Sequence, residues 1–270
     1  MKKFADTARR LLSIALNLFI VWAEPIALPM SWDWGKEQMF IFYTEDSNIL
    51  SACICAMVAV GQLVCIFTGR NLPHWLHTLK YIATCCLTMT FLTVVFVLGP
   101  MYEDGNGWYI MLCTSSMLYH HLLNPLAAIF SFVLLERTPR LPRSTVKWAL
   151  LPTVLYGGII LWLNIQCVVD GPYPFMKVYD QSVQASVLWC IAILLMNYFY
   201  AWLLWKLNGG KKENGFWRRS FFTDVCSWKR KIFGGGEEQA GVSGRTAGWH
   251  VCDRTGTACG KTDTEKSICL

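Results

Sequence analysis

Six stretches of the sequence are each long and apolar enough to cross a lipid bilayer. They lie near residues 11–30, 39–68, 76–99, 108–136, 147–169 and 183–207. A membrane-spanning helix needs about 20 mainly apolar residues, and such spans are helical because lipid offers no partner for an unpaired backbone group. Only 16% of the residues are charged, against about a quarter in soluble domains. The sequence therefore predicts an all-α, polytopic membrane helix bundle with six transmembrane helices in residues 1–207.

The distribution of basic residues predicts the orientation of this bundle. Lys and Arg are concentrated in the cytoplasmic loops of membrane proteins. Here they occur at the N-terminus, in the 69–80 turn, in the 137–147 loop and after the sixth span, whereas the alternate loops contain only Lys36 and Lys177. We therefore expect an integral protein of the plasma or cytoplasmic membrane with both termini in the cytoplasm.

The two ends of the chain need separate interpretations. The first span has a basic start, as a secretory signal does, but its apolar character resumes at Ile26, so we expect an uncleaved anchor. Residues 208–270 hold 11 of the 20 glycines and show little apolar periodicity, so they cannot bury enough surface to fold alone. We expect a cytoplasmic, basic, glycine-rich and largely disordered tail.

The twelve cysteines predict neither a disulfide framework nor a metal site. Eight lie in apolar stretches, where a thiol behaves as a small apolar residue, and the four in the tail lack the paired spacing of metal ligands. Haem would need histidines that face each other at matched depth, but His120 and His121 lie well inside a span, whereas His74 and His77 lie near the cytoplasmic end of the third span. We expect no metal and no cofactor.

A short set of polar residues interrupts the apolar spans. Polar groups are costly in hydrocarbon, so each of them is a candidate functional residue. Depths estimated from a rise of about 1.5 Å per residue put most of the set between the outer surface and the middle of the membrane. The set comprises Glu24, the run Thr44-Glu45-Asp46-Ser47-Asn48, His120, His121, Asn124, Asn164 and Asn197.

Thr44 and His120 supply the minimum for nucleophilic catalysis. A hydroxyl needs a neighbouring base to take its proton, and neutral histidine serves as that base near pH 7. His120 and His121 point about 100° apart on a helix, so at most one of them faces the site, and we predict that it is His120. The estimated depths of Thr44 and His120 differ by about 6–10 Å, which helix tilt or a kink at Pro125 must absorb. The supporting residues, which would orient the ring or stabilise an oxyanion, are Glu24, Asp46, Ser47, Asn48 and Asn124.

Two other interpretations stay open. Thr, Ser and Asn in membrane helices commonly form hydrogen bonds between helices and so stabilise packing, and this is the role that we expect for Asn164 and Asn197. Alternatively, the same polar cluster binds or transports a small solute or a proton, and then Glu24 and Asp46 matter more than Thr44.

Three short motifs in register resemble the androgen-induced protein family of multipass membrane hydrolases. Phe42-Tyr43-Thr44 resembles the threonine motif of that family, and His120 with Pro125 is similar to its histidine segment. Tyr173-Pro174-Phe175 and the last span are similar to its closing segment, so the resemblance covers about residues 38–207. The run after Thr44 is more polar than in the family and looks more like bacterial membrane proteins of unassigned activity.

The resemblance implies a hydrolase with Thr44 as nucleophile and His120 as base. Members of the family cleave fatty acid esters of hydroxy fatty acids. We therefore expect hydrolysis of a lipid ester or a related acyl substrate. The expected partners are membrane lipids and a lipid-like small molecule, and no nucleic acid.

Overall fold

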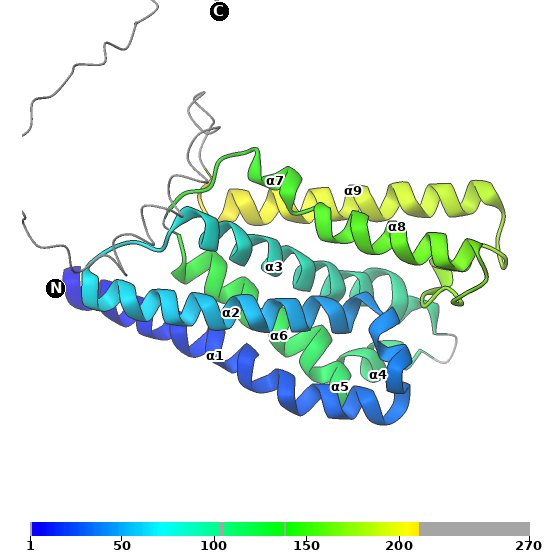
Figure 1. Ribbon diagram of the computed structural model, residues 1–270, viewed down its shortest axis with the longest axis horizontal. Coiled ribbons are helices and arrows are strands. Elements are labelled where there is room, and N and C mark those ends of the chain that lie inside the picture. The colour runs from blue at the N-terminus through cyan, green and yellow to red at the C-terminus, as the bar shows by residue number, and fades with distance from the viewer. Residues whose placement is uncertain (1, 103–104, 138, 211–270) are drawn as a thin grey trace, which may run out of the picture. The chain divides into compact units, whose positions relative to one another are not determined.

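The computed structural model describes residues 2–102, 105–137 and 139–210, which fold as a bundle of helices that run back and forth (Figure 1). Among these residues, six helices are long and apolar enough to cross a membrane, which confirms the predicted six-span, all-α fold. The spans are Phe4–Ile41, Tyr43–Thr68, His74–Met101, Ser115–Leu135, Thr145–Ile165 and Val183–Leu207. The expected disorder of the tail concerns residues 211–270, which lie outside the described residues.

The spans are built from α-helices joined to short π-helical and 3-10 segments. The α-helices are α1 (Lys2–Gly35), α2 (Tyr43–Thr68), α3 (His74–Thr93), α4 (Gly107–Cys113), α5 (Ser115–Met117), α6 (Asn124–Phe130), α7 (Thr145–Trp148), α8 (Leu151–Ile165) and α9 (Val183–Leu207). The π-helical segments are η2 (Val94–Leu98), η4 (Leu118–Leu123) and η5 (Ser131–Leu135), and the 3-10 segments are η1 (Lys36–Ile41), η3 (Gly99–Met101) and η6 (Pro174–Met176).

The ends of the long helices follow from local sequence. The Ser182 hydroxyl caps α9 by accepting a hydrogen bond from the Ala185 amide at 3.2 Å, as Ser does at many helix starts. α2 ends at Gly69, whose φ of 66° is in the left-handed region that glycine adopts without steric cost. Pro152 lies in the first turn of α8, where its missing N–H costs no hydrogen bond.

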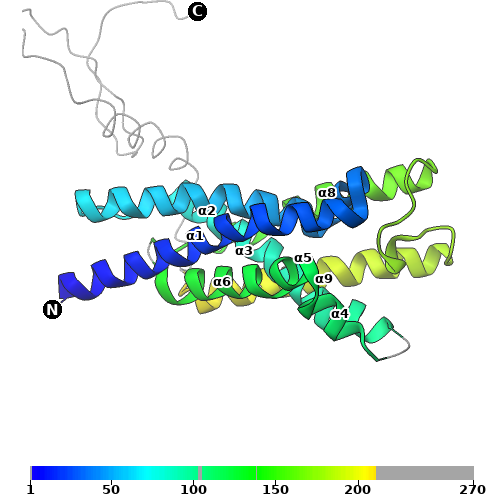
Figure 2. The ribbon, with the colours of Figure 1, turned by 90° about the horizontal axis from the view of Figure 1, so that it is seen from below.

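The first three spans and α6 form the closely packed part of the bundle. α1 packs on α2, α2 packs on α3, and α6 lies against both α1 and α3 (Figures 1 and 2). Ile20, Ala52, Leu87, Ala127 and Ala128 form an apolar cluster where these helices meet. α8 and α9 expose most of their large apolar side chains, as helices that face lipid do. We call the end of the bundle with the start of α1 and the end of α9 the proximal end, and the opposite end the distal end.

The fourth span is shorter than the sequence predicted. The apolar stretch near 108–136 is divided after α4, because the chain turns at Thr114 and Ser115, and Ser115 has a φ of 46°. α4 diverges from the line of α5 and α6 (Figure 2), and the span starts only at Ser115. The span then continues through the π-helical turn η4, which widens the helix at the two histidines.

A buried polar network joins the helices at the proximal end. Lys80 donates to the side-chain oxygen of Asn17 at 2.7 Å, and Asn17 donates to the Glu136 carboxylate at 2.8 Å. The same carboxylate accepts hydrogen bonds from the hydroxyls of Ser13, at 2.7 Å, and Ser131. We had placed Lys80 in a loop, but it is fully buried within the third span. The network therefore connects α1 to α3 and to the end of the fourth span.

Candidate functional site

Thr44 and His121 form a hydrogen-bonded pair at the distal end. Thr44 is the second residue of α2, and its Oγ1 lies 3.1 Å from Nε2 of His121. The other ring nitrogen, Nδ1, lies 2.8 Å from the carbonyl oxygen of Met111 in α4. A carbonyl can only accept, so Nδ1 carries the proton and Nε2 accepts the hydrogen of the Thr44 hydroxyl. This is the arrangement that a general base needs toward a hydroxyl nucleophile.

The predicted pairing of Thr44 with His120 is wrong in geometry. The two ring nitrogens of His120 face two carboxylates instead: Nε2 lies 3.5 Å from Glu24 and Nδ1 lies 3.8 Å from Glu45. His120 is completely buried there, between α1 and α2. The histidine that meets the nucleophile candidate is its neighbour, His121.

The course of the fourth span explains why Thr44 meets His121 and why the estimated depths of Thr44 and His120 differed. The estimated depth of His120 counted residues 108–114 as part of the membrane helix, and seven residues correspond to about 10 Å of rise. Because α4 turns aside and the span begins at Ser115, the histidines lie closer to the distal surface, level with the first turn of α2. No kink at Pro125 is needed to bring His121 to Thr44.

Most of the predicted supporting residues form hydrogen bonds that fix the backbone of α2 and η4. Ser47 donates to the Thr44 carbonyl at 3.1 Å, and Asn48 donates to the same carbonyl at 2.8 Å and to that of His120 at 3.3 Å. Asn124 donates to the Asn48 side-chain oxygen at 3.0 Å. These contacts fix α2 against η4 and use the donors that we had expected to stabilise an oxyanion. Asp46 is exposed and does not orient a histidine among the described contacts.

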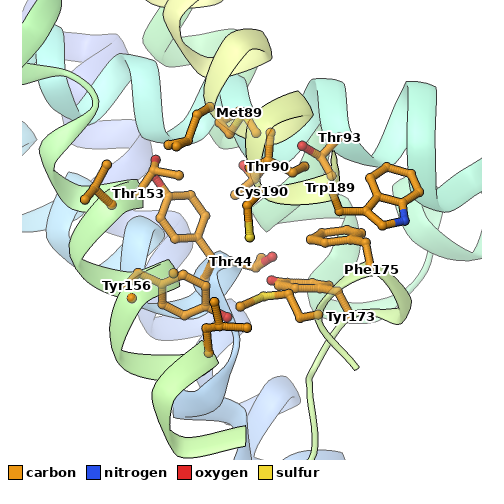
Figure 3. Close-up of a pocket in the computed structure, with 18 of the residues that line it drawn as sticks. Thr44, Met89, Thr90, Thr93, Thr153, Tyr156, Tyr173, Phe175, Trp189 and Cys190 are labelled. Atoms are coloured by element: carbon orange, nitrogen blue, oxygen red, sulfur yellow. The ribbon is translucent and has the colours of Figure 1, made fainter. Parts of the chain in front are cut away.

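A mainly apolar cavity of about 200 Å³ lies beside Thr44. It is enclosed by the start of α2, the end of the third span, α8, α9 and the 3-10 turn η6 (Figure 3). Its wall includes Tyr43, Thr44, Met89, Thr90, Thr93, Val94, Leu98, Thr153, Val154, Tyr156, Gly157, Gly158, Leu161, Tyr173, Phe175, Met176, Ser186, Trp189, Cys190, Ile193 and Leu194. Several of these residues on α8 and α9 are also exposed on the lipid-facing side. A ligand in this cavity would be largely apolar and would touch the Thr44 hydroxyl.

Hydrogen bonds hold α8 in place at the cavity. The Thr153 hydroxyl contacts the Tyr43 hydroxyl at 3.0 Å and accepts a hydrogen bond from Asn197 at 2.6 Å. The Tyr156 hydroxyl donates to the Ile41 carbonyl at 2.7 Å. Asn164 binds the loop after α8 through the Val169 carbonyl at 2.9 Å. Asn197 therefore makes the contact between helices that we expect from it, whereas Asn164 holds the loop that follows its own helix.

The Tyr173 hydroxyl lies against the first turn of α2 (Figure 3). It lies near the Thr44 hydroxyl and the backbone of Tyr43 and Thr44. Burial raises the pKa of Tyr173 despite the opposing effect of these contacts, so the hydroxyl stays protonated at neutral pH. The first amides of a helix lack partners within it and carry partial positive charge. The Tyr173 oxygen therefore occupies a position that favours an anionic oxygen.

The fold and this site define a polytopic membrane helix bundle with a buried threonine–histidine pair beside an apolar cavity. Within the described residues, no group of three His, Cys, Asp or Glu side chains is arranged to hold a metal ion. Comparison of the chain with protein-family models, with curated proteins and with solved structures gives no match.

Proposed function

We propose that the protein is an integral membrane hydrolase that cleaves a lipid ester or a related acyl bond, with Thr44 as nucleophile and His121 as general base. The observation that carries the proposal is the 3.1 Å contact between Thr44 Oγ1 and His121 Nε2 on the wall of an apolar cavity. The contact to the Met111 carbonyl orients the ring, a role that a carboxylate has in serine hydrolases. The base differs from the His120 implied by the family resemblance.

The geometry supports a two-step reaction. His121 Nε2 takes the hydroxyl proton while Thr44 Oγ1 attacks the carbonyl carbon of the ester, and the tetrahedral intermediate then expels the alcohol, which receives that proton. Water repeats the attack on the acyl-threonine with the same base, which releases the carboxylic acid and restores the Thr44 hydroxyl. Each step moves one proton through His121.

The start of α2 supplies donors for the oxyanion of this intermediate. The amides of Tyr43 and Thr44 lie near the Tyr173 hydroxyl, and a substrate carbonyl oxygen at Thr44 would compete for them. Backbone amides beside the nucleophile are a common oxyanion hole. In this proposal the substrate carbonyl displaces the Tyr173 hydroxyl from the amides when it binds.

The topology proposed from the basic residues places the reaction in the outer half of the membrane. With both termini in the cytoplasm, the distal end faces outward, and the cavity between α8 and α9 borders the outer leaflet. A lipid-like substrate then reaches Thr44 sideways from the membrane, and membrane lipids are the partners of the protein.

Labelling with an alkyl fluorophosphonate tests the proposal. The wild type should be labelled, and Thr44→Ala and His121→Ala should each reduce the labelling rate by at least about 10³-fold, because a nucleophile and its base act as one unit. The double variant should react no more slowly than either single variant. Thr88→Ala is the matched control, since its buried hydroxyl bonds the Thr84 carbonyl, away from the cavity.

The same experiment separates the hydrolase from a binding or transport protein. A protein that only binds a solute in this cavity would fold but would not be labelled. Its alanine variants would be unlabelled as well. Labelling that persists in Thr44→Ala would also contradict the proposal, because the probe would then react at another nucleophile.

A further inference from the structure

A second cluster of ionisable groups lies behind the Thr44–His121 pair. Glu24 of α1, Glu45 of α2 and His120 of η4 meet in the distal half of the bundle, with exposed fractions of 6%, 2% and 0%. The His120 ring lies between the two carboxylates, 3.5 Å from Glu24 and 3.8 Å from Glu45. Three helical elements thus each contribute one ionisable side chain to a site that the hydrolysis steps do not use.

The side chains of this cluster have few hydrogen bonds. Both carboxylate oxygens of Glu24 and both ring nitrogens of His120 have no hydrogen-bond partner among the described residues. Glu45 accepts one hydrogen bond, from Ser31 at 3.2 Å. Buried polar atoms are nearly always bonded, so a buried ring that approaches two carboxylates this closely is placed to bond them when it carries protons.

Bound protons can balance the charges of this buried cluster. Two ionised carboxylates beside a neutral imidazole would leave two uncompensated negative charges in a medium where such charges are very costly. A proton on the ring and a second one on either carboxylate make the cluster neutral. The separations exceed a normal hydrogen bond by less than about 1 Å, so a small movement of the ring transfers a proton to either side.

Few other titratable groups face the cluster. On α2 the next carboxylate, Asp46, is exposed, and on η4 the neighbouring His121 uses its Nδ1 proton at the Met111 carbonyl. α5 and α6 present the neutral side chains of Ser116 and Asn124. Lys80 and Glu136 belong to the proximal network, and on each helix apolar cluster residues such as Ile20 lie between the two groups.

We propose that Glu24, His120 and Glu45 together form a proton-binding site beside the Thr44–His121 pair. One role of the site rests on the proposed function: ester hydrolysis followed by ionisation of the acid releases one proton. Glu24 and Glu45, on either side of His120, share one carboxylate that is still ionised, and this carboxylate can accept the proton. The binding site itself does not depend on hydrolysis.

Nuclear magnetic resonance of the full chain in lipid nanodiscs, with ¹⁵N-labelled histidine and ¹³C-labelled glutamate carboxylates, tests the site. His120→Gln identifies the His120 signals. In the wild type, carboxylate signals of Glu24 and Glu45 should change in the same pH step as the His120 ring, because strongly interacting groups titrate together. A His120 ring that titrates without any glutamate signal, or that does not titrate between about pH 4 and pH 10, would overturn the proposal.

Isosteric variants give a second readout. Glu24→Gln and Glu45→Gln each remove one of the two carboxylates that share protons with the ring, so in each variant the ring should titrate together with the single remaining glutamate. Glu37→Gln removes an exposed carboxylate of η1 that does not belong to the cluster, and it should leave the step in place. An unchanged step in both Gln variants contradicts the proposal.

The test also distinguishes this proposal from the hydrolase proposal. Thr44→Ala should retain the coupled step of His120 and the glutamates while it loses fluorophosphonate labelling. A wild type with the coupled step and without labelling would refute the hydrolase alone, and labelling without the coupled step would refute the proton site alone.

Discussion

At the scale of single residues, the backbone decides which of two adjacent histidines meets Thr44. His120 and His121 are identical in chemistry and differ in what lies around them. The carbonyl of Met111 binds one ring nitrogen of His121, so the other nitrogen can only accept. His120 faces acids on both sides and cannot serve as a base for Thr44 in this geometry.

Tyr173 gives a prediction at this scale. Tyr173→Phe removes the oxygen that lies near the amides of Tyr43 and Thr44, and therefore removes the competitor of the substrate carbonyl. We expect KM to fall several-fold while kcat changes little, because the amides remain in place. Steady-state kinetics on a long-chain ester would measure both constants. A loss of kcat of about 10²-fold or more would show instead that the Tyr173 hydroxyl itself stabilises the transition state.

Part of the candidate site could be predicted from the sequence at this scale. Thr44 and the polar run after it stand out because polar side chains are rare in apolar spans. The choice of His121 could not be predicted, since it depends on a left-handed turn at Ser115 and on a π-helical segment, and no residue pattern marked either. Tyr173 was visible only as part of a motif, and its contact with α2 depends on how the 166–182 loop folds.

At the scale of elements, α8 determines the size of the cavity. Gly157 and Gly158 line it, and a Cβ atom added at either position would have no atom within 4 Å. The two glycines therefore leave space on the wall of the cavity that any other residue would fill. Each glycine lowers the stability of the helix by about 1 kcal/mol relative to alanine. The space that the two glycines leave in the cavity is a reason for their presence despite this cost.

Gly157 variants test this interpretation. Gly157→Ala should stabilise the protein by up to about 1 kcal/mol and preserve labelling. Gly157→Leu should fold equally well but slow the labelling by a long-alkyl fluorophosphonate at least tenfold, because the side chain enters the cavity. A short-chain fluorophosphonate, which needs less space, should react with both variants at the wild-type rate.

Thermal unfolding in detergent would accompany these rate measurements. An equal slowing of the long and short probes in a stable Gly157→Leu protein would mean that the cavity does not hold the alkyl chain.

The helices themselves were largely predictable, because length and apolar composition decide which segments cross a membrane. The division of the fourth span is the exception. Residues 108–113 are as apolar as a span requires, yet they form the separate helix α4. Tertiary contacts decide this: Gly107 packs against the Gly99 carbonyl, where an added Cβ would lie 2.3 Å away, and the Trp108 indole donates to the Val95 carbonyl at 3.0 Å.

At the scale of the whole bundle, the proposed orientation makes a direct prediction. Single cysteines at Glu37 and Asp180, which are exposed at the distal end, should react with a membrane-impermeant maleimide added to intact cells. Cysteines at Arg70 and Arg143, which are exposed at the proximal end, should react only after the membrane is permeabilised. The control is the parent protein with its exposed native cysteines replaced. Labelling of the proximal cysteines alone in intact cells would show that the topology is the inverse of the one proposed.

The proximal network could not be anticipated at this scale. Lys80 and Glu136 lie near the ends of apolar stretches, where charged residues usually reach water. Their burial depends on four segments that meet in three dimensions, and a one-dimensional hydropathy pattern does not contain that information.

The proximal network also has a consequence for how the protein is made. The ribosome delivers α1 first, but the partners of Asn17 are Lys80, in the third span, and Glu136, which follows Asn17 by 119 residues. Until these partners arrive, the Asn17 amide nitrogen has only Ser13 of its own helix as a partner, and the Asn17 side-chain oxygen lacks its Lys80 donor. A nascent chain released before Glu136 carries Lys80 inside the membrane without its carboxylate. The fourth span must therefore be complete before the buried lysine has a carboxylate in its network.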